Sequence, residues 1–467
     1  MNVLAVNKFY HVIVFFSVIM LVNIFVLILI WPGMWGGDEL WLLPQVREFD
    51  IATTQHWLVA VFYIWSFMLI PSPVGIVFFI ILLNVTIQTI LYSEIYDRIL
   101  NVKWAFLLII PCCLPEILLF NEYPLRCSVY GSVEILFILV AKRMFVNVKK
   151  YDLIKISAII IILATLRTET IYYLLIGIAM MLYLYKKSYI QLKKVCIGIF
   201  LITFGVWGVN RIQTALTYPS VFDRNTLQCV ADPLVEMARN EAEKHTDWVE
   251  CPILNEIDRT FSVELILENE GTGMGLMWSR YGGFFQEGRP EIRKGFWKAY
   301  TQLLISNLDI FLSNRWEVFC STQKNNVKEK AQISIDLWSE EACEKEPTVL
   351  NKNMLAFSVP DYRRYETVLH TLTLATEGQT AIEVVRLLCN SIIIPGAFLI
   401  LFLGWSIKNR KWIVVAVLIG VLAKIPLVYV TMPGTEYMYY YPVYYVGVIA
   451  IFVCFIEKIG KLKTAQD

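Results

Sequence analysis

The chain has 467 residues, of which 57% are hydrophobic and only 17% are charged, against roughly 25% charged residues in a typical soluble protein. A soluble fold of this length cannot hide so much apolar surface, which excludes a cytosolic enzyme, a nucleic-acid-binding protein and a disordered scaffold. We therefore expect an all-α polytopic membrane protein. The 41 basic and 40 acidic residues nearly cancel, so net charge indicates no partner, but the placement of charge constrains the topology.

Eleven apolar stretches follow one another along the chain, and a membrane-crossing helix needs about 20 apolar residues. The first has no small-residue cleavage site, so we expect an uncleaved signal-anchor. The stretches are Tyr10–Trp31, Trp57–Ile70, Val74–Tyr92, Trp104–Phe120, Cys127–Phe145, Leu153–Leu166, Ile171–Tyr185, Val195–Ile212, Leu387–Trp405, Trp412–Thr431 and Met438–Ile456.

Basic residues indicate how many stretches cross. Eleven crossings would put some basic clusters outside the cell, against the positive-inside rule. If Trp57–Ile70, which Pro71 and Pro73 close, lies in the interface instead, about ten spans remain and both termini are cytoplasmic. All six clusters then fall inside: Lys8, Arg98/Lys103, Lys142/Arg143/Lys149/Lys150/Lys155, Lys186/Lys187/Lys193/Lys194, Lys408/Arg410/Lys411 and Lys458/Lys461/Lys463.

This topology divides the chain into three parts. Residues 1–212 form seven spans, with an interfacial helix at about 55–71 in the first outer loop. Residues 213–385 form a large extracytoplasmic loop of mixed structure, and residues 386–467 form three further spans and a cytoplasmic tail. We therefore expect a multi-pass protein of the plasma (cell) membrane.

The long outer loop contains four cysteines, Cys229, Cys251, Cys320 and Cys343. Four cysteines allow three pairings, and the simplest hypothesis joins Cys229 to Cys251 and Cys320 to Cys343. Such disulfides would require an oxidising compartment. No Cys-x-x-Cys pair or Cys/His cluster along the sequence predicts a zinc site.

Polar residues gather at the predicted outer face. Asp38 and Glu39 follow the first span and are flanked by Gly36 and Gly37, which let the backbone approach a ligand. Further acids, bases and a histidine come from other outer turns. Mutual ion pairing that orients helices is one interpretation, and a site for an anionic lipid headgroup beside a general base is the other. The further residues are Glu122, Glu169, Arg126, Arg167, Arg211 and His56.

Three ionisable residues, Glu116, Glu134 and Lys424, lie deeper in the predicted spans, where such residues indicate function by default. Lys424 could reach the outer surface to neutralise a phosphate, or it could pair with Glu116 or Glu134. The last outer turn is rich in tyrosines, including Tyr437 and Tyr439. They are typical of an interfacial aromatic belt and equally of a sugar-stacking surface.

The order of these motifs resembles that of the GT-C superfamily of integral-membrane glycosyltransferases, which includes protein O-mannosyltransferases and aminoarabinose transferases. In that family an acidic motif follows the first span, as Asp38 and Glu39 do here. A juxtamembrane helix then begins at a position matched by His56, and a second acidic residue follows the third span, as Glu122 does. The last outer turn keeps Tyr437. The resemblance covers residues 1–212 best and 386–457 loosely.

The resemblance implies that a sugar moves from a polyprenyl-phosphate donor to a glycan, lipid or protein acceptor at the outer membrane face, with inversion. Asp38 is the implied general base, and Glu39 and Glu122 orient the acceptor or, with Asp38, hold a divalent cation such as Mg²⁺ or Mn²⁺. The positive charges that stabilise the leaving phosphate are Arg126, Arg167, Arg211 and Lys424. The implied sugar or acceptor contacts are His56, Glu169, Tyr437 and Tyr439.

Other functions stay open. A transporter or flippase of lipid-linked oligosaccharide predicts polar residues along the full depth of the spans, whereas those here concentrate at the outer face and favour an enzyme. A polysaccharide polymerase would use outer-loop arginines, for which Arg280, Arg289 and Arg293 are candidates. In a non-catalytic envelope assembly protein, Asp38→Asn would change nothing.

Overall fold

The computed structural model describes residues 3–51, 55–124, 126–146, 148–149, 151–187, 189–217, 219–279, 281–338, 361–373, 384 and 390–461. Within these ranges every element longer than an isolated bridge is helical, which agrees with the expected all-α class. The chain divides into two compact units. Unit 1 comprises residues 1–213, 326–425 and 438–467, and unit 2 comprises residues 214–325 and 426–437.

The division begins at the predicted start of the outer loop but differs from the predicted parts further on. Residues 326–385 of that loop belong to unit 1, and residues 426–437 near the last outer turn belong to unit 2. Two long helices cross the division, α10 (Leu192–Leu216) and α17 (Leu308–Leu337). The loop is therefore two separate pieces of structure, one of which packs with the apolar helices.

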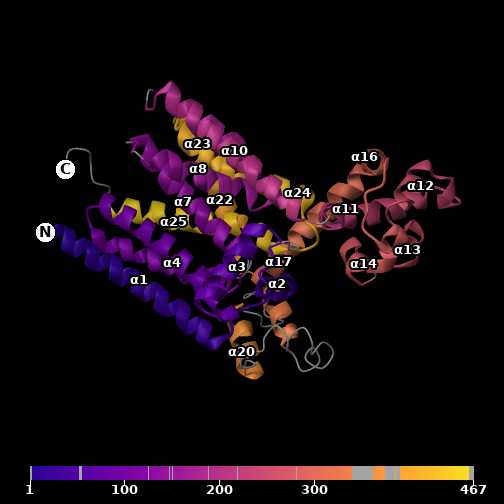
Figure 1. The fold of residues 1–467 in the computed structure, drawn as a ribbon, viewed down its shortest axis with the longest axis horizontal. Coiled ribbons are helices and arrows are strands. Elements are labelled where there is room, and N and C mark those ends of the chain that lie inside the picture. Colours follow the sequence, from indigo (N-terminus) through magenta and orange to yellow (C-terminus); the bar gives the residue numbers. More distant parts are fainter. Residues whose placement is uncertain are drawn as a thin grey trace. The chain divides into compact units, whose positions relative to one another are not determined.

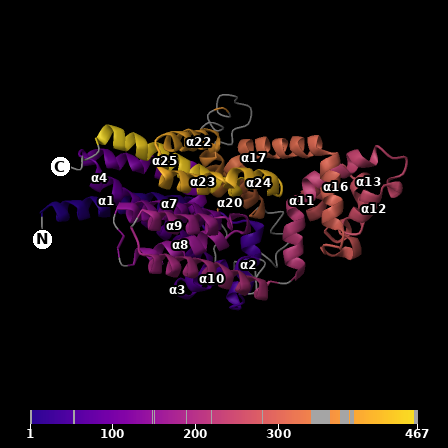
Figure 2. The ribbon, with the colours of Figure 1, turned by 90° about the horizontal axis from the view of Figure 1, so that it is seen from above.

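Unit 1 is a bundle in which α1, α4, α7 and α25 lie side by side (Figures 1 and 2). Shorter helices fill the turns and cover the remaining faces. Its elements are α1 (Val3–Leu29), α2 (Gly37–Arg47), α3 (Trp57–Leu69), α4 (Pro73–Arg98), η1 (Val102–Leu108), α5 (Ile109–Cys112), α6 (Pro115–Asn121), α7 (Arg126–Val146), α8 (Asp152–Thr165), η2 (Thr168–Thr170), α9 (Tyr173–Lys186), α20 (Tyr362–Leu372), α22 (Ile393–Lys408), α23 (Trp412–Leu422) and α25 (Tyr441–Gly460), with α24 (Lys424–Thr431) and η5 (Tyr437–Tyr439) at its boundary.

Among the described residues, five helices are long and apolar enough to cross a membrane: Asn7–Leu29, Pro73–Arg98, Leu192–Leu216, Trp412–Thr431 and Tyr441–Gly460. A bent pair of helices would make a sixth. By contrast, α3 has 13 residues, about 20 Å at 1.5 Å per residue, which is shorter than a hydrocarbon core of about 30 Å. Its length fits the predicted interfacial helix.

The predicted span Trp104–Phe120 is not one straight helix. Val102–Cys112 and Pro115–Asn121 are separate segments bent by 69°. Pro115 stands at the start of α6, and Leu114 before it is extended (φ −63°, ψ 140°), because a residue before proline is disfavoured in the α region. The break brings α6 and its C-cap residue Glu122 to the end of unit 1 at which the candidate site lies.

Basic residues mark the opposite end of unit 1. Lys8 pairs with Asp97, Arg98 with Glu457 and Arg143 with Glu94, and the backbone N–H of Leu100 donates to the carbonyl oxygen of Lys461 at 2.8 Å. The start of α1 and the ends of α4, α7 and α25 therefore lie together (Figure 1). Four of the six basic clusters predicted to share one side of a membrane thus share one end of the bundle.

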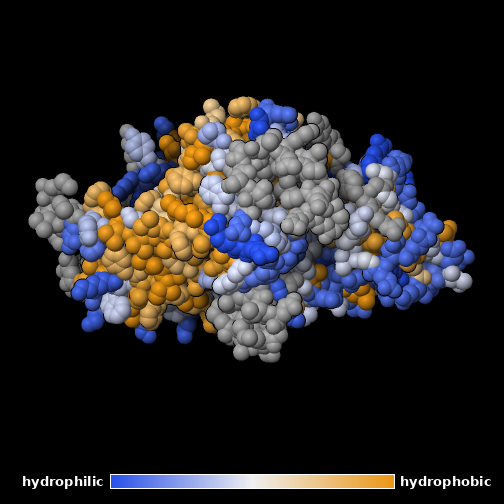
Figure 3. All heavy atoms as spheres, turned by 90° about the horizontal axis from the view of Figure 1, so that it is seen from below, coloured by the Kyte–Doolittle hydropathy of each residue, from blue (hydrophilic) through white to orange (hydrophobic). Residues whose placement is uncertain are grey.

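The outer faces of these helices are strongly apolar. Figure 3, seen from the side on which α1 lies, shows a broad hydrophobic surface between more hydrophilic regions. On α1, Leu21 and Phe25 are 66% and 60% exposed, and Leu401 on α22 is 74% exposed. Exposed apolar surface of this extent indicates contact with another apolar phase, as a membrane protein requires.

The segment between α1 and α2 is held by residues from much later in the chain. The backbone N–H of Trp35 donates to the Ser334 hydroxyl at 2.9 Å, and that hydroxyl lies 2.6 Å from the hydroxyl of Tyr365. Tyr365 donates in turn to the carbonyl oxygen of Gly33 at 3.1 Å. Gly33 has φ +100°, a conformation that favours glycine. Part of the predicted outer loop therefore braces the first outer turn.

Unit 2 is a small helical domain with its own core, built around Leu234, Phe261 and Leu303. Its described elements are helical rather than the mixed structure expected for the loop. They are α11 (Pro219–Ala242), η3 (Trp248–Glu250), α12 (Pro252–Asp258), α13 (Val263–Glu268), α14 (Gly273–Ser279), α15 (Tyr281–Phe284), η4 (Gln286–Gly288), α16 (Phe296–Ser306) and the first part of α17.

The cysteines of this region do not form the predicted local bridge. Cys229, in α11, and Cys251, before α12, are not joined to each other, so the predicted disulfide between them is not formed. Cys320 is free, and its predicted partner Cys343 lies outside the described residues. The Cys229 thiol instead donates to the carbonyl oxygen of Asn225, one helical turn back, at 3.4 Å.

Candidate functional site

Two groups of mostly buried polar side chains lie in unit 1, at the ends of the helices away from the basic clusters. We call them the first-loop cluster (Glu39, His56, Tyr63, Glu122 and Tyr123) and the Arg167 cluster (Cys127, Tyr130, Glu134, Arg167, Glu169, Tyr173, Lys424 and Tyr439). The charge of Arg126, at the start of α7, acts on His56 of the first and on Glu169 of the second. The two clusters therefore adjoin.

Glu122 is the C-cap residue of α6 and is fully buried. Its carbonyl oxygen accepts a hydrogen bond from the backbone N–H of Met34 at 3.0 Å, which ties the turn after α6 to the first outer turn. Neither carboxyl oxygen of Glu122 has a hydrogen-bond partner among the described residues. Burial raises the pKa of this carboxyl well above its usual range. An unsatisfied buried carboxyl is costly, so it marks a site at which a ligand could bind.

Glu39 lies in the first turn of α2 and is also buried. Carboxylates are favoured in the first turn because the helix dipole is positive there. A side chain at Gly36, the N-cap, would lie 2.1 Å from the Tyr123 hydroxyl and 2.6 Å from Oε2 of Glu39. Glycine is therefore needed at this position, because any side chain would clash with Tyr123 and Glu39. Asp38 begins the same helix turn, but its side chain lies outside the described residues.

His56 caps the N-terminus of α3. Its Nδ1 accepts a hydrogen bond from the backbone N–H of Leu58 at 3.3 Å, while Nε2 is buried with no described partner. Burial, with a smaller contribution from the charge of Arg126, lowers the pKa of His56 to about 4. About two helical turns further on, Tyr63 donates to the carbonyl oxygen of Pro124, which fixes α3 against the turn that contains Glu122.

The lowered pKa of His56 predicts a dependence of stability on pH. Between its usual pKa of 6.5 and the folded value of about 4, the unfolded chain binds a proton that the folded protein does not. Stability is therefore complete above pH 6.5 and falls by about 1.4 kcal/mol per pH unit below it, roughly 3 kcal/mol in all. His56→Asn, which retains a capping side chain, should flatten this part of the unfolding profile between pH 7 and 4; an unchanged profile would contradict the assignment.

Arg167 is the centre of the second cluster and is only 2% exposed. Its guanidinium pairs with Glu169, donates to the Cys127 sulfur, and lies 4.3 Å from the ring centroid of Tyr439. Burial opposes the charge of Glu169, but Arg167 and Lys424 outweigh that effect and hold the pKa of Glu169 at about 2. Mutual ion pairing, one of the two sequence interpretations, thus describes Arg167 and Glu169.

Lys424, at the start of α24, is fully buried. Its Nζ lies 3.7 Å from the ring centroid of Tyr130, a cation–π contact, and has no hydrogen-bond partner among the described residues. Glu134 accepts a hydrogen bond from the Tyr173 hydroxyl at 2.8 Å through Oε1, while its Oε2 has no described partner. Lys424 and Glu134 interact electrostatically, whereas Glu116, the other predicted partner, interacts with Tyr441.

Two predicted site residues are not joined to these clusters. Arg211 is exposed on α10, where its guanidinium lies 5.8 Å from the ring of Trp207 on the same helix. Tyr437 is buried and belongs to unit 2. Sequence reasoning also missed Tyr63, Tyr123, Cys127, Tyr130 and Tyr173. Of these only Tyr130 carried a signal, since it precedes Glu134 by one helical turn and so shares its face.

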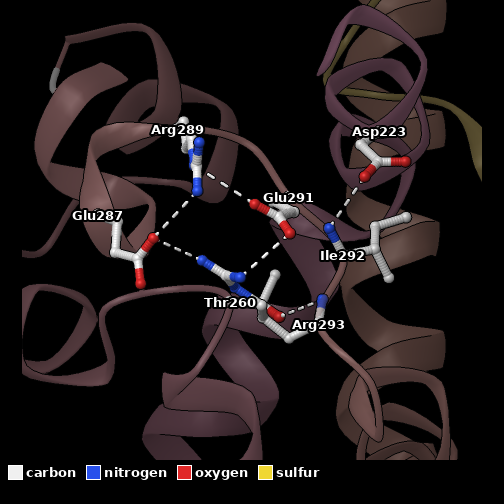
Figure 4. A network of polar contacts seen from close by, with 7 residues as sticks. All are labelled: Asp223, Thr260, Glu287, Arg289, Glu291, Ile292 and Arg293. Carbon is white, nitrogen blue, oxygen red and sulfur yellow. Dashed lines mark hydrogen bonds and ion pairs between the residues drawn. The ribbon is translucent and has the colours of Figure 1, made fainter. Parts of the chain in front are cut away.

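The outer-loop arginines considered for a polymerase are engaged with acids (Figure 4). Arg293 lies 2.7 Å from Glu287 and 3.1 Å from Glu291, and Arg289 lies 3.3 Å from each of the same two glutamates. Arg280 lies outside the described residues. Most of these side chains are well exposed, so the ring of pairs contributes little stability, but its positive charges are locally neutralised.

The site geometry thus consists of buried carboxyls beside a tyrosine-lined pair of cations. Comparison with known proteins finds no matching family model, no matching curated protein and no matching solved structure.

Proposed function

We propose that this chain is a membrane glycosyltransferase that moves a sugar from a polyprenyl-phosphate donor to an envelope glycan, lipid or protein acceptor. Glu122 is the observation that carries the proposal. A carboxyl that is fully buried and has no described hydrogen-bond partner is kept at a cost to stability, and the first-loop cluster contains a second buried carboxyl, Glu39 on α2. Carboxyls in one cluster and cations in the adjoining one suit an acceptor hydroxyl on one side and a phosphate on the other.

The Arg167 cluster supports a lipid-phosphate donor. Lys424 and Arg167 put two positive charges close together, and Lys424 has no hydrogen-bond acceptor among the described residues. A buried, weakly solvated cation stabilises a departing phosphate more than an exposed one does. Tyr439, stacked on Arg167, and Tyr130 offer faces for a sugar ring. We assign Arg126 to the same phosphate, since it adjoins both clusters.

In the proposed reaction, Asp38 removes the proton of the acceptor hydroxyl as its oxygen attacks the anomeric carbon. The bond from that carbon to the phosphate oxygen breaks, and the electron pair leaves with the polyprenyl phosphate. One displacement inverts the anomeric configuration. Glu39 and Glu122 orient the acceptor or hold a divalent cation such as Mg²⁺, for which the two unpartnered oxygens of Glu122 fit as hard ligands. His56 and Glu169 lie beside the acceptor.

The membrane arrangement belongs to the same proposal. We place about ten spans and both termini as predicted, with the basic end of unit 1 in the cytoplasm and the two clusters at the outer face of the plasma membrane. A polyprenyl chain confines its phosphate to the bilayer boundary, so a transferase for such a donor needs its cations there.

A lipid-linked oligosaccharide transporter is the second candidate. A hydrogen-bonded chain leads inward from the first-loop cluster: Asn121 donates to Asn23 at 2.9 Å, and Asn84 donates to Asn121 at 2.8 Å. Further along α4, Gln88 donates to the Tyr445 hydroxyl at 3.0 Å. These buried polar groups support a transporter more strongly than the sequence alone did, since a polar ligand that passes through the bundle needs polar contacts along its path.

The test compares envelope glycans by mass spectrometry in strains that lack the gene, carry it intact, or carry it as Asp38→Asn. Asparagine keeps the shape of the side chain but removes the base. We expect one sugar to disappear both in the deletion and in the Asp38→Asn strain, with the protein present at normal level.

The same comparison separates the candidates. If the deletion alters the glycans and Asp38→Asn restores them fully, Asp38 is not the base and the transporter is favoured. If neither strain differs from the intact one, the transferase proposal fails.

A further inference from the structure

Three potential metal ligands meet at the end of α11, within unit 2. Glu241 and His245 are four residues apart, and Nε2 of His245 lies 3.8 Å from Oε1 of Glu241. Cys251, the N-cap residue of α12, completes the group. One ligand atom from each residue lies within 4.8 Å of the others. The sequence spacing of a glutamate, a histidine and a cysteine gave no recognised pattern, so only the fold brings this group together.

We propose that Glu241, His245 and Cys251 bind a zinc-type divalent metal ion. A thiolate, an imidazole and a carboxylate form a donor set suited to zinc, and three protein ligands leave a fourth tetrahedral position for water. Cys251 is a free thiol and is 2% exposed, whereas the His245 side chain is 34% exposed and gives the ion a route in. On binding, the sulfur forms a bond to the metal and the thiol proton is released to solvent.

The neighbours of Glu241 orient its carboxylate for this role. Its Oε2 accepts hydrogen bonds from Lys244 at 2.8 Å and from Asn307 at 2.9 Å. These contacts leave Oε1, the oxygen nearer His245, to face the metal. Outer partners of this kind fix a ligand's orientation. The positive charge of Lys244 opposes a cation, which limits the affinity but does not occupy the metal-facing oxygen.

A bound metal would connect two helices of unit 2. Glu241 lies in the last turn of α11 and Cys251 directly precedes α12, so the ion would close the segment between them. A ligand that binds only the folded state stabilises it. Metal should therefore protect the α11–α12 connection against unfolding and proteolysis, independently of any reaction in unit 1.

The test is a titration of the reduced, metal-free, full-length protein in detergent with Co²⁺, which reports thiolate ligation through its absorption. We expect one Co²⁺ per chain, with a sulfur-to-cobalt charge-transfer band that Zn²⁺ abolishes. Cys251→Ser should remove the band. Cys251→Ser and His245→Gln should each weaken binding at least about 100-fold, since loss of an outer partner alone costs roughly 10–100-fold.

Cys229→Ser is the matched control, because Cys229 is another thiol of unit 2, in α11, and lies outside the group. The substitution should leave the charge-transfer band and the affinity unchanged. If Cys251→Ser does not fold, His245→Gln still tests the metal site, because His245 is exposed and its replacement should not disturb folding. Wild-type affinity in His245→Gln, or a band that depends on Cys229, would overturn the proposal. So would a Cys229–Cys251 disulfide found by mass spectrometry of the unreduced protein.

Discussion

Replacing Arg167 with alanine should lower the free energy of unfolding by about 3–5 kcal/mol, the range for removing one partner of a buried ion pair. Arg167 is 2% exposed and contacts Glu169, Cys127 and Tyr439 together. Without it, the charge of Glu169 stays buried and unpaired, and the stacked ring of Tyr439 loses its neighbour. Chemical unfolding in detergent micelles, followed by tryptophan fluorescence, measures the change.

Arg143→Ala is the matched control for this experiment. Arg143 also pairs with a glutamate, Glu94, but the two side chains are 36% and 34% exposed, and exposed pairs contribute about 0–1 kcal/mol. Adding Glu169→Gln to Arg167→Ala should recover part of the loss, because it removes the stranded charge. Equal costs for Arg167→Ala and Arg143→Ala would show that the buried pair is not what holds this end of unit 1.

Replacing Glu122 with glutamine should reduce sugar transfer by about 10²-fold, the cost of misplacing a reactant by about 1 Å, because Glu122 is proposed to orient the acceptor or to hold the cation. Burial raises the pKa of Glu122, which favours the neutral form more than in an exposed carboxyl, and glutamine has the shape of that neutral form. The variant should therefore fold normally and fail in the reaction. The measurement is kcat/KM for transfer by the purified protein, using the polyprenyl-phosphate sugar that the glycan comparison identifies.

Glu94→Gln controls for the loss of a glutamate elsewhere. Glu94 lies at the basic end of unit 1 and pairs with Arg143, so its replacement should leave kcat/KM within about twofold, as expected for a surface change away from the site. If Glu122→Gln transfers sugar at the wild-type rate, its buried carboxyl takes no part in the reaction.

The features that the sequence predicted best depend on local pattern. Hydropathy predicted apolar helices, and the basic residues Lys8, Arg98 and Arg143 gather at one end of unit 1 as the charge rule required. The apolar composition of Trp104–Phe120 predicted one continuous span. Composition does not show the bend before Pro115, although the proline itself is a local signal for it. The division of the outer loop between two units was not predictable, since it depends on contacts between residues hundreds of positions apart.

The candidate site was predictable only as a list of residues on one face. The burial of Glu122 and Arg167 could not be predicted from the sequence, because it depends on contacts with other segments. The carbonyl oxygen of Glu122 bonds to the backbone of Met34, and the guanidinium of Arg167 contacts Cys127 and Tyr439. Arg211 was grouped with Glu122 and Arg167 only because the predicted topology puts it at the same level of the membrane, whereas in the structure Arg211 is exposed on the surface of α10. Partners such as Cys127 for Arg167 and Tyr130 for Lys424 come from other helices, and no local spacing specifies such pairs.

The brace on the first outer turn sets an order for biosynthesis. Trp35 and Gly33 obtain their hydrogen bonds from Ser334 and Tyr365, which the ribosome adds about 300 residues later. At typical translation rates of about 5–20 residues per second, that interval is roughly 15–65 s. Throughout it, the turn that leads into α2 must wait at the membrane with these bonds unmade, so a nascent chain arrested before Tyr365 would contain the α2 acids without the support that positions them.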